Sequence, residues 1–303
     1  MSEPAPKSRS LLDRLGRWSL RRLGAKSLWH EVRGVRLHAY HLARHPDAPA
    51  DAPPLVLLHG VGSAASTFTR LLKRLRPHVG DVYLPEAPAH GLSAEPEPPM
   101  TPDALFTLVR AWLDEVPRAP FLLYGNSLGG GASLRYAIER PERVRALLLL
   151  SPAGAQTPPD ELASLVSSFS FESNADARRF MKRLFRRPRW YHNLAAGELK
   201  RRLGTPSLRQ FFAEVGSGDT LDPADVARLT MPILLMWGQA ERLLPEAHRA
   251  WFKAHLPPHA VMLEPAHFAH SAYIEHPQDV ADEVLTFLRS AGVLPPAPQR
   301  RAM

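Results

Sequence analysis

The chain has 303 residues, of which 45% are hydrophobic and 22% are charged, a composition typical of a soluble globular protein with a sizeable core. Its apolar stretches all fall short of the ~18 residues that cross a bilayer, which excludes a membrane-spanning helix. Cysteine is absent, and this excludes disulfides, thiol nucleophiles, iron–sulfur clusters and cysteine-ligated zinc.

The net charge of +8 is concentrated in two segments. Residues 1–27 carry seven basic and two acidic side chains, and residues 178–209 carry eleven basic and one acidic, so the rest of the chain is net acidic. Basic segments of this kind favour anionic partners: phosphate groups, an anionic membrane or nucleic acid. Two solvated helix faces are the alternative interpretation.

Residues 1–30 predict a basic amphipathic extension. Leucines 11, 12, 15 and 23 and Trp18 follow helical spacing, but arginines interrupt them, so the apolar core of a secretory signal is missing. We therefore expect a cytoplasmic protein. The helix could lie on a membrane surface, or it could pack its leucine and tryptophan stripe against the body of its own protein. We favour the second.

From residue 35 onward, short apolar runs alternate with longer helical patterns. The expected strands cover residues 35–42, 55–58, 82–84, 121–124, 146–150, 233–237 and 261–263. The expected helices cover residues 66–76, 102–116, 128–140, 246–256 and 277–291. Continuous apolar runs fit strands that are buried on both faces of a parallel sheet. The alternation therefore predicts an α/β fold with a doubly wound, mostly parallel sheet.

About eighty residues between 150 and 231 break this alternation, because they contain no convincing strand. Helical spacing recurs at residues 162–166, 180–185 and 208–215. A connection of this length is unusual in a compact domain. We expect a helical insertion that lies over the ends of the strands.

The strongest motif is Gly125-Asn126-Ser127-Leu128-Gly129, between an expected strand and an expected helix. This context is typical of a nucleophile elbow, in which a tight turn pushes the serine hydroxyl outward. The glycines flank the turn because it leaves no room for bulk. The hydroxyl then stands at the positive end of the helix dipole. We therefore predict that Ser127 is the nucleophile.

A serine hydroxyl needs a general base. In folds that use this elbow, the base comes after both the nucleophile and the acid along the chain. His267 and His270 both follow the last expected strand. A carboxylate must orient the base. Glu241 is the only acid in the loop after the strand at 233–237, although a surface ion pair with Arg242 would also explain it. Three other acids precede that strand and are poorer candidates: Asp219, Asp222 and Asp225.

Two backbone N–H groups must meet the oxyanion of an acyl intermediate. Leu128, the residue after the nucleophile, supplies one. Val61, in the loop His59-Gly60-Val61-Gly62-Ser63, is the expected second donor, and His59 is expected to brace this loop. No cofactor or metal is expected. The loop lacks the third glycine of a dinucleotide fingerprint, and His38 and His41 would face opposite sides of a strand.

Four blocks together resemble the α/β-hydrolase superfamily over about residues 30–292: residues 59–63, residues 88–93, residues 125–129, and His270 with Glu275 and Pro277. Similar members carry a Gly-His pair followed by Glu five and Pro seven residues later. This implies His270 rather than His267 as the base, with Ala269 in place of the glycine.

In that superfamily the carboxylate is usually Asp, and Glu is an accepted alternative. The resemblance therefore implies a triad of Ser127, His270 and Glu241. The resemblance implies an α/β-hydrolase fold with a helical cap inserted after the sixth strand. The implied divisions are a basic extension (1–30), a core (31–151 and 231–292), a cap (152–230) and a flexible tail (293–303).

Ser127 argues against epoxide hydrolases and haloalkane dehalogenases, which use Asp at the elbow. The cap segment resembles those of bacterial lipases and monoacylglycerol-lipase-like esterases. We therefore expect a serine hydrolase that cleaves a small-molecule carboxylic ester, such as a lipid ester, through an acyl-enzyme. A C–C bond hydrolase, an acyltransferase and a non-catalytic binding protein are the alternatives. Peripheral contact with an anionic membrane remains open, nucleic acid is not expected, and the oligomeric state is left open.

Overall fold

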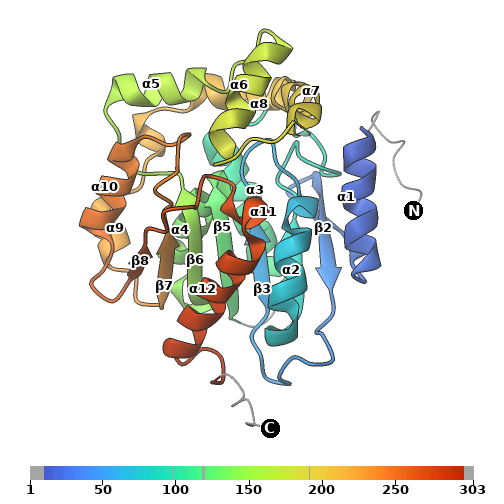
Figure 1. The fold of residues 1–303 in the computed structure, drawn as a ribbon, viewed down its shortest axis with the longest axis vertical. Helices are drawn as coiled ribbons and strands as arrows, with labels where there is room; N and C mark the ends of the chain where they lie inside the picture. The colour runs from blue at the N-terminus through green and yellow to red at the C-terminus, as the bar shows by residue number, and fades with distance from the viewer. Residues whose placement is uncertain (1–9, 98, 118–119, 191, 297–303) are drawn as a thin grey trace.

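A computed structural model describes residues 10–296, except for 98, 118–119 and 191. One eight-stranded sheet, in the order β1-β2-β4-β3-β5-β6-β7-β8, runs through the molecule with helices on both faces (Figure 1). β2 pairs antiparallel with β1 and β4, and all other neighbours are parallel. The predicted α/β fold with a mostly parallel sheet is confirmed. The strands are β1 (Lys26–Val32), β2 (Val35–Leu42), β3 (Leu55–Leu58), β4 (Val82–Pro85), β5 (Phe121–Ser127), β6 (Val144–Pro152), β7 (Ile233–Met236) and β8 (Val261–Leu263).

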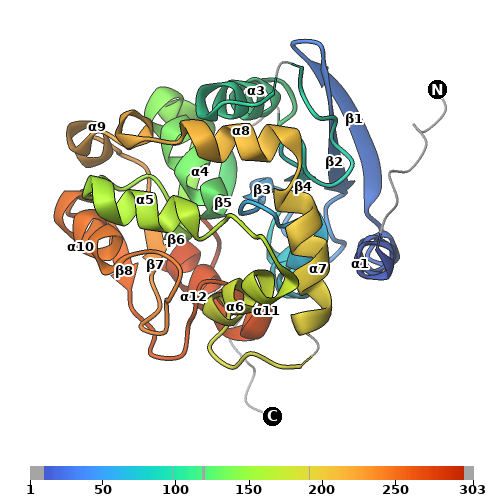
Figure 2. The same ribbon diagram turned by 90° about the horizontal axis from the view of Figure 1, so that it is seen from above.

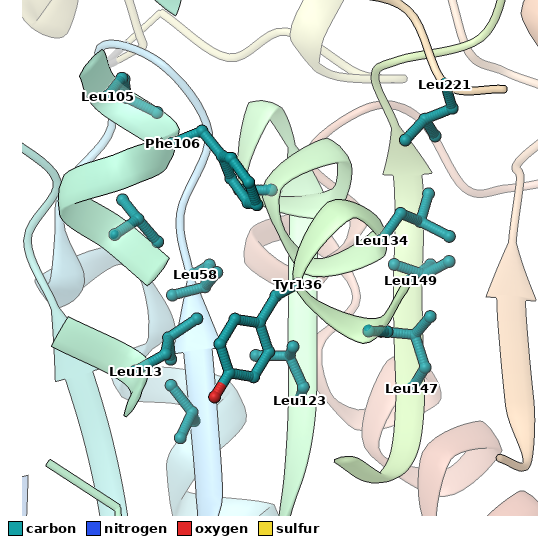
Figure 3. Packing of buried hydrophobic residues seen from close by; sticks show 14 of the residues in the cluster. Leu58, Leu105, Phe106, Leu113, Leu123, Leu134, Tyr136, Leu147, Leu149 and Leu221 are labelled. Carbon is teal, nitrogen blue, oxygen red and sulfur yellow. The ribbon is translucent and has the colours of Figure 1, made fainter. Parts of the chain in front are cut away.

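The central strands are apolar because helices cover both of their faces. Every residue of β3, β5 and β7 is buried. One core lies under α3 (Pro102–Glu115), α4 (Leu128–Glu139), α9 (Pro223–Ala227) and α10 (Glu246–His255). Figure 3 shows part of it, where Leu123 and Leu149 of the sheet face Tyr136 and Leu134 of α4. The second core lies under α1 (Leu11–Arg22), α2 (Thr69–Leu75), α11 (Ala272–Glu275) and α12 (Pro277–Ser290).

The first strand was not expected from the sequence, and the predicted boundary at residue 30 falls inside it. β1 is an edge strand in which only Val32 is buried, so it lacks a continuous apolar run. A two-residue turn joins it to β2, with φ of 48° at Arg33 and 78° at Gly34. Two positive φ values are those of a type I′ hairpin turn, which usually carries Asn or Asp at its first position.

The helical insertion, residues 159–214, follows the sixth strand and contains α5 (Pro159–Ser167), α6 (Asn174–Leu184), α7 (His192–Leu203) and α8 (Pro206–Glu214). It lies over the carboxyl end of the sheet, at the top of Figure 1, and spreads across it in Figure 2. At the other end of the chain, Leu294 is buried against the second core, two residues beyond the predicted end of the core. The rest of the predicted tail, residues 297–303, lies outside the described residues.

Helix α1 packs in the opposite sense to our expectation. Leu11, Leu15 and Trp18 are 68%, 51% and 55% exposed, whereas Asp13 and Arg17 are buried. The prediction that the leucine and tryptophan stripe covers the body of the protein is therefore wrong. The inward face consists instead of Leu20, which is fully buried, and of polar side chains that find partners in the rest of the chain. No helix in the described part of the chain is long and apolar enough to cross a membrane.

Candidate active site

Ser127 stands at the junction of β5 and α4 in a strained backbone conformation, with φ 56° and ψ −123°. A non-glycine residue rarely adopts a positive φ, and such strain concentrates at functional turns. The turn is crowded on both sides. A Cβ added to Gly125 would lie 2.5 Å from the Gly129 carbonyl oxygen, and one added to Gly129 would lie 2.3 Å from the Leu58 carbonyl oxygen. Only glycine fits at either position.

His270 and Glu241 come together beside this turn, although they follow different strands. The His270 Nδ1 lies 2.8 Å from the Glu241 Oε2, and the two side chains are 4% and 3% exposed. The His270 ring also borders the same cavity as Ser127. The structure thus places the three residues that the sequence singled out at one end of the sheet.

The Glu241 carboxylate is held by its own loop as well as by His270. Its Oε1 accepts hydrogen bonds from the backbone N–H groups of Arg242, Leu243 and Leu244 at 3.0, 2.7 and 3.2 Å. Burial alone would raise the pKa of Glu241, but the charge and hydrogen bond of His270, with the Leu243 N–H, outweigh burial and lower it. The carboxylate is therefore ionised at neutral pH, as a group that orients an imidazole must be.

The other candidates occupy structural positions. The His267 Nε2 lies 2.8 Å from the Asp279 Oδ2 on α12, outside the cavity of Ser127. Asp219 accepts a bond from the Gly216 N–H, and Asp222 caps α9 through the Ala224 N–H. None of these groups contacts His270 or Glu241 in the described part of the chain.

Val61 and Leu128 both border the cavity that contains Ser127. Neither of their N–H groups donates a hydrogen bond within the described residues. Two buried histidines brace the loop that carries Val61. The His90 Nε2 accepts from the Gly62 N–H at 2.9 Å, and the His59 Nε2 accepts from the Ala87 N–H at 3.2 Å.

Both bracing histidines are neutral, because each accepts a hydrogen bond through one ring nitrogen. Burial lowers the pKa of His59, and it lowers that of His90 to about 3. The His90 Nδ1 donates to the Pro88 carbonyl at 2.9 Å, which fixes the tautomer that leaves Nε2 as an acceptor. The two loops after β3 and β4 therefore hold each other.

Sequence reasoning missed Asn126, the neighbour of Ser127. Its buried Nδ2 donates to the carbonyl oxygens of Leu150 and His270 at 3.0 and 3.1 Å. One side chain thus ties the turn to β6 and to the loop of His270. Only its place beside Ser127 could have drawn attention to it.

Two cavities meet at Ser127. The first, of about 150 Å³, lies between α3, α4 and the helical insertion. Its lining is mostly apolar and includes Leu105, Phe106, Leu165, Phe169, Phe211 and Leu221. His248 also borders it, and burial lowers the pKa of that imidazole to about 4. The second cavity, of about 320 Å³, contains His270 and extends along α7 to Leu12 and Asp13 of α1.

One group in the described residues has the geometry to hold a metal, and the sequence did not suggest it. The ligand atoms of His267, His276 and Asp279 lie within 4.8 Å of one another. They line a separate cavity together with Arg70 and Arg186, whose positive charges oppose a cation. Ser127 and His270 do not border that cavity.

Comparison with known proteins agrees with this geometry. The model of the alpha/beta hydrolase family matches residues 55–283. A pimeloyl-[acyl-carrier protein] methyl ester esterase of Xanthomonas oryzae pv. oryzae (strain MAFF 311018) is 30% identical over 266 residues, which cover 81% of this chain and 99% of that relative.

Two solved structures share the fold. A membrane phospholipase A has a TM-score of 0.78 at 19% identity and covers 93% of this chain and 91% of its own. A carboxylesterase from Bacillus subtilis has a TM-score of 0.72 at 19% identity, with 92% and 98% covered. The chain therefore belongs to the alpha/beta hydrolase family, and the activity that these findings support is ester hydrolysis.

Proposed function

We propose that this protein is a serine hydrolase of carboxylic esters in which Ser127, His270 and Glu241 act as a catalytic triad. The observation that carries the proposal is the buried Glu241–His270 pair at the cavity of the strained Ser127. A buried, ionised carboxylate on Nδ1 leaves Nε2 of the imidazole as a base for the serine hydroxyl.

The chemistry follows from these positions. His270 takes the proton of the Ser127 hydroxyl as its oxygen attacks the ester carbonyl, and the N–H groups of Val61 and Leu128 stabilise the oxyanion. His270 then protonates the leaving alcohol, and the acyl group stays on Ser127. In the second half, His270 removes a proton from water, which hydrolyses the acyl-enzyme and restores the serine.

We also propose that the helical insertion is a cap that shapes the acyl site. Its aromatic side chains Phe169 and Phe211 line the apolar cavity, opposite Leu105 and Phe106 of the core. An apolar lining binds a hydrocarbon chain and excludes water from the acyl-enzyme. The substrate class is therefore an ester with an apolar acyl chain, such as a lipid ester, and a cytoplasmic location remains a prediction.

A fluorophosphonate probe and a series of p-nitrophenyl esters test this function. We expect the probe to label the parent protein and not Ser127→Ala, and we expect Ser127→Ala to lose about 10⁴-fold or more in kcat. Ser133→Ala is the matched control, since the Ser133 hydroxyl already donates to the Gly129 carbonyl at 2.7 Å. A C–C bond hydrolase or an acyltransferase would be labelled as well, so release of p-nitrophenol without an acceptor alcohol is required. A protein that resists labelling would be a binding protein.

A second candidate function is hydrolysis of a methyl ester on an acyl chain that is bound to a carrier protein. The relative with 30% identity has a name of this kind, and the insertion segment 178–209 carries eleven basic residues, which would suit an acidic protein partner. Hydrolysis of a carrier-bound methyl ester, compared with the free methyl ester, tests it. We expect at least a tenfold preference for the carrier-bound form, lost at high salt. Equal rates would reject it.

A further inference from the structure

We propose that the outward face of α1 is a docking surface for an anionic lipid bilayer. This inference does not depend on the proposed reaction, because it concerns a helix at the margin of the molecule, beside β2 in Figure 1 and seen end-on in Figure 2. The outward face consists of Leu11, Leu15, Trp18 and Arg22, which follow one another at three- or four-residue spacing.

Large apolar side chains on this face are exposed to an unusual degree. Leu11, Leu15 and Trp18 are more than half exposed, and Leu12 on their flank is 42% exposed. The described part of the chain has only two other large hydrophobic residues in this class, Trp190 and Val261, and neither belongs to a row. A continuous apolar row on one helix marks an interaction site rather than the scattered exposure of an ordinary surface.

The orientation of α1 is fixed by its inner face, which combines the fully buried Leu20 with paired polar side chains. The Arg17 guanidinium donates to the Tyr40 hydroxyl at 3.2 Å and lies 3.9 Å from the Glu86 carboxylate. Asp13 is paired with Arg202 of α7. The backbone is also close, since a Cβ on Gly16 would lie 2.6 Å from the Ser66 hydroxyl. Turning the leucines inward would bury them only by breaking these contacts.

The chemistry of the face selects a lipid surface. Arg14, Arg21 and Arg22 are exposed on the same helix, and the Arg22 guanidinium stacks over the Trp18 ring at 4.7 Å. Cationic side chains that flank a Leu/Trp row are typical of helices that lie in the headgroup region of anionic membranes. Trp is suited to that depth because its ring is apolar and its N–H is polar.

The face is also placed to serve the site. Leu12 and Asp13 border the cavity that contains Ser127 and His270. A bilayer under α1 would therefore lie beside the end of this cavity that Leu12 and Asp13 border. Phe185, in the basic insertion segment, is buried and takes no part.

Sedimentation with vesicles tests the proposal on the full chain. The vesicles contain phosphatidylcholine alone or phosphatidylcholine with phosphatidylglycerol, at about 0.05 M and about 0.5 M salt. We expect binding only to the anionic vesicles, lost at the higher salt. The double variant Leu15→Ser/Trp18→Ser should bind at least tenfold more weakly, with unchanged turnover of a water-soluble ester. Trp190→Ser is the matched control, because Trp190 is 76% exposed within the basic insertion segment.

Three outcomes would overturn the proposal. The first is equal sedimentation with neutral and anionic vesicles, or sedimentation with neither. The second is a loss of binding in Trp190→Ser as large as in the double variant, which would assign the contact to the insertion. The third is a concentration-dependent dimer that the double variant abolishes, since a second copy of the chain would then cover the face. Vesicle binding is measured without hydrolysis, so a failed reaction would leave this test intact.

Discussion

The site around Ser127 and the N-terminal helix α1 each depend on a buried carboxylate, but the two carboxylates meet different partners. Glu241 accepts three backbone N–H groups of its own loop and faces His270. Asp13 faces Arg202, a side chain of the insertion that is 189 positions away. Burial raises the pKa of Asp13, whereas His270 and the Leu243 N–H lower that of Glu241.

This difference separates two uses of buried charge. At Ser127 the polar groups come from loops at strand ends, so they hold the proposed triad in place. At α1 they join the buried Leu20 in attaching one face of the helix to the body, and the row of Leu11, Leu15 and Trp18 is left outward. Substitutions in the first region should therefore remove turnover and spare vesicle binding, and substitutions on the outward face of α1 should do the reverse.

The largest effect is expected from His270→Ala. Without the base, turnover of a soluble ester should fall about 10⁴-fold, because triad members act as a unit. His267→Ala is the matched control and should change turnover less than about twofold, since His267 pairs with Asp279 instead. Steady-state kinetics on both variants measures this. A larger loss in His267→Ala than in His270→Ala would show that the base is misassigned.

Glu241→Gln should cost about 10³-fold in kcat, since an amide no longer fixes the tautomer of His270 or stabilises its charged form. Glu246→Gln is the control, because the Glu246 carboxylate is exposed and pairs with Arg249. Vesicle binding should be the same for both variants. If Glu241→Gln keeps near-parental kcat, the acid lies elsewhere, and Asp219 and Asp222 are next to test.

Acid should destabilise the structure beneath both regions through Glu86 and His90. Burial alone would raise the pKa of Glu86, but the bond from His38, the charge of Arg17 and the Leu92 N–H lower it to about 2. Because the folded pKa lies below the unfolded value, this stabilisation is complete above about pH 4.5 and is lost as pH falls toward 2. It is worth up to about 3 kcal/mol.

His90 acts in the same direction at higher pH, because its folded pKa of about 3 lies below the unfolded value. Its contribution to the free energy of unfolding is complete above about pH 6.5 and declines as pH falls toward 3. Urea unfolding between pH 7 and pH 3 measures both slopes. Glu86→Gln should flatten the curve below about pH 4.5, and an unchanged curve would contradict the assigned partners.

Much of the fold could be predicted because its signals are local. The apolar runs of β3, β5 and β6 and the glycines around Ser127 each reflect contacts within a few residues or with a covering helix. β1 could not be predicted, because an edge strand alternates weakly and its turn uses Arg33 where Asn or Asp is usual.

The orientation of α1 could not be predicted for a different reason. Its sequence is amphipathic in the same way as α12, whose apolar residues are buried. The partners that turn α1 outward, Tyr40, Glu86 and Arg202, are distant in the chain. For the same reason the contact of Asn126 with the carbonyl of His270, 144 positions away, leaves no trace in the sequence pattern.

Arg202 is the residue that joins the two regions, and it gives the smallest expected effect. Its guanidinium pairs with Asp13 and Glu198 and donates to the Gly62 carbonyl at 3.1 Å, next to the expected oxyanion donor Val61. Removing the Arg202 guanidinium should let the loop that carries Val61 relax without changing the proposed triad. Because His90 still holds the Gly62 N–H, we expect only about a tenfold fall in kcat for Arg202→Met.

Arg201→Met is the control for this prediction, because Arg201 lies on the same helix and pairs with the same Glu198 but is half exposed. A positioning role predicts that Arg202→Met weakens a boronate transition-state analogue by the same factor as kcat, while KM for the ester changes little. If the role of Arg202 were merely structural, Arg202→Met would lower the melting temperature but would leave both the analogue affinity and kcat at parental values. Since Asp13 loses its nearer arginine in Arg202→Met and keeps only Arg201, at 3.9 Å, α1 should loosen. Vesicle binding should therefore weaken more in Arg202→Met than in Arg201→Met.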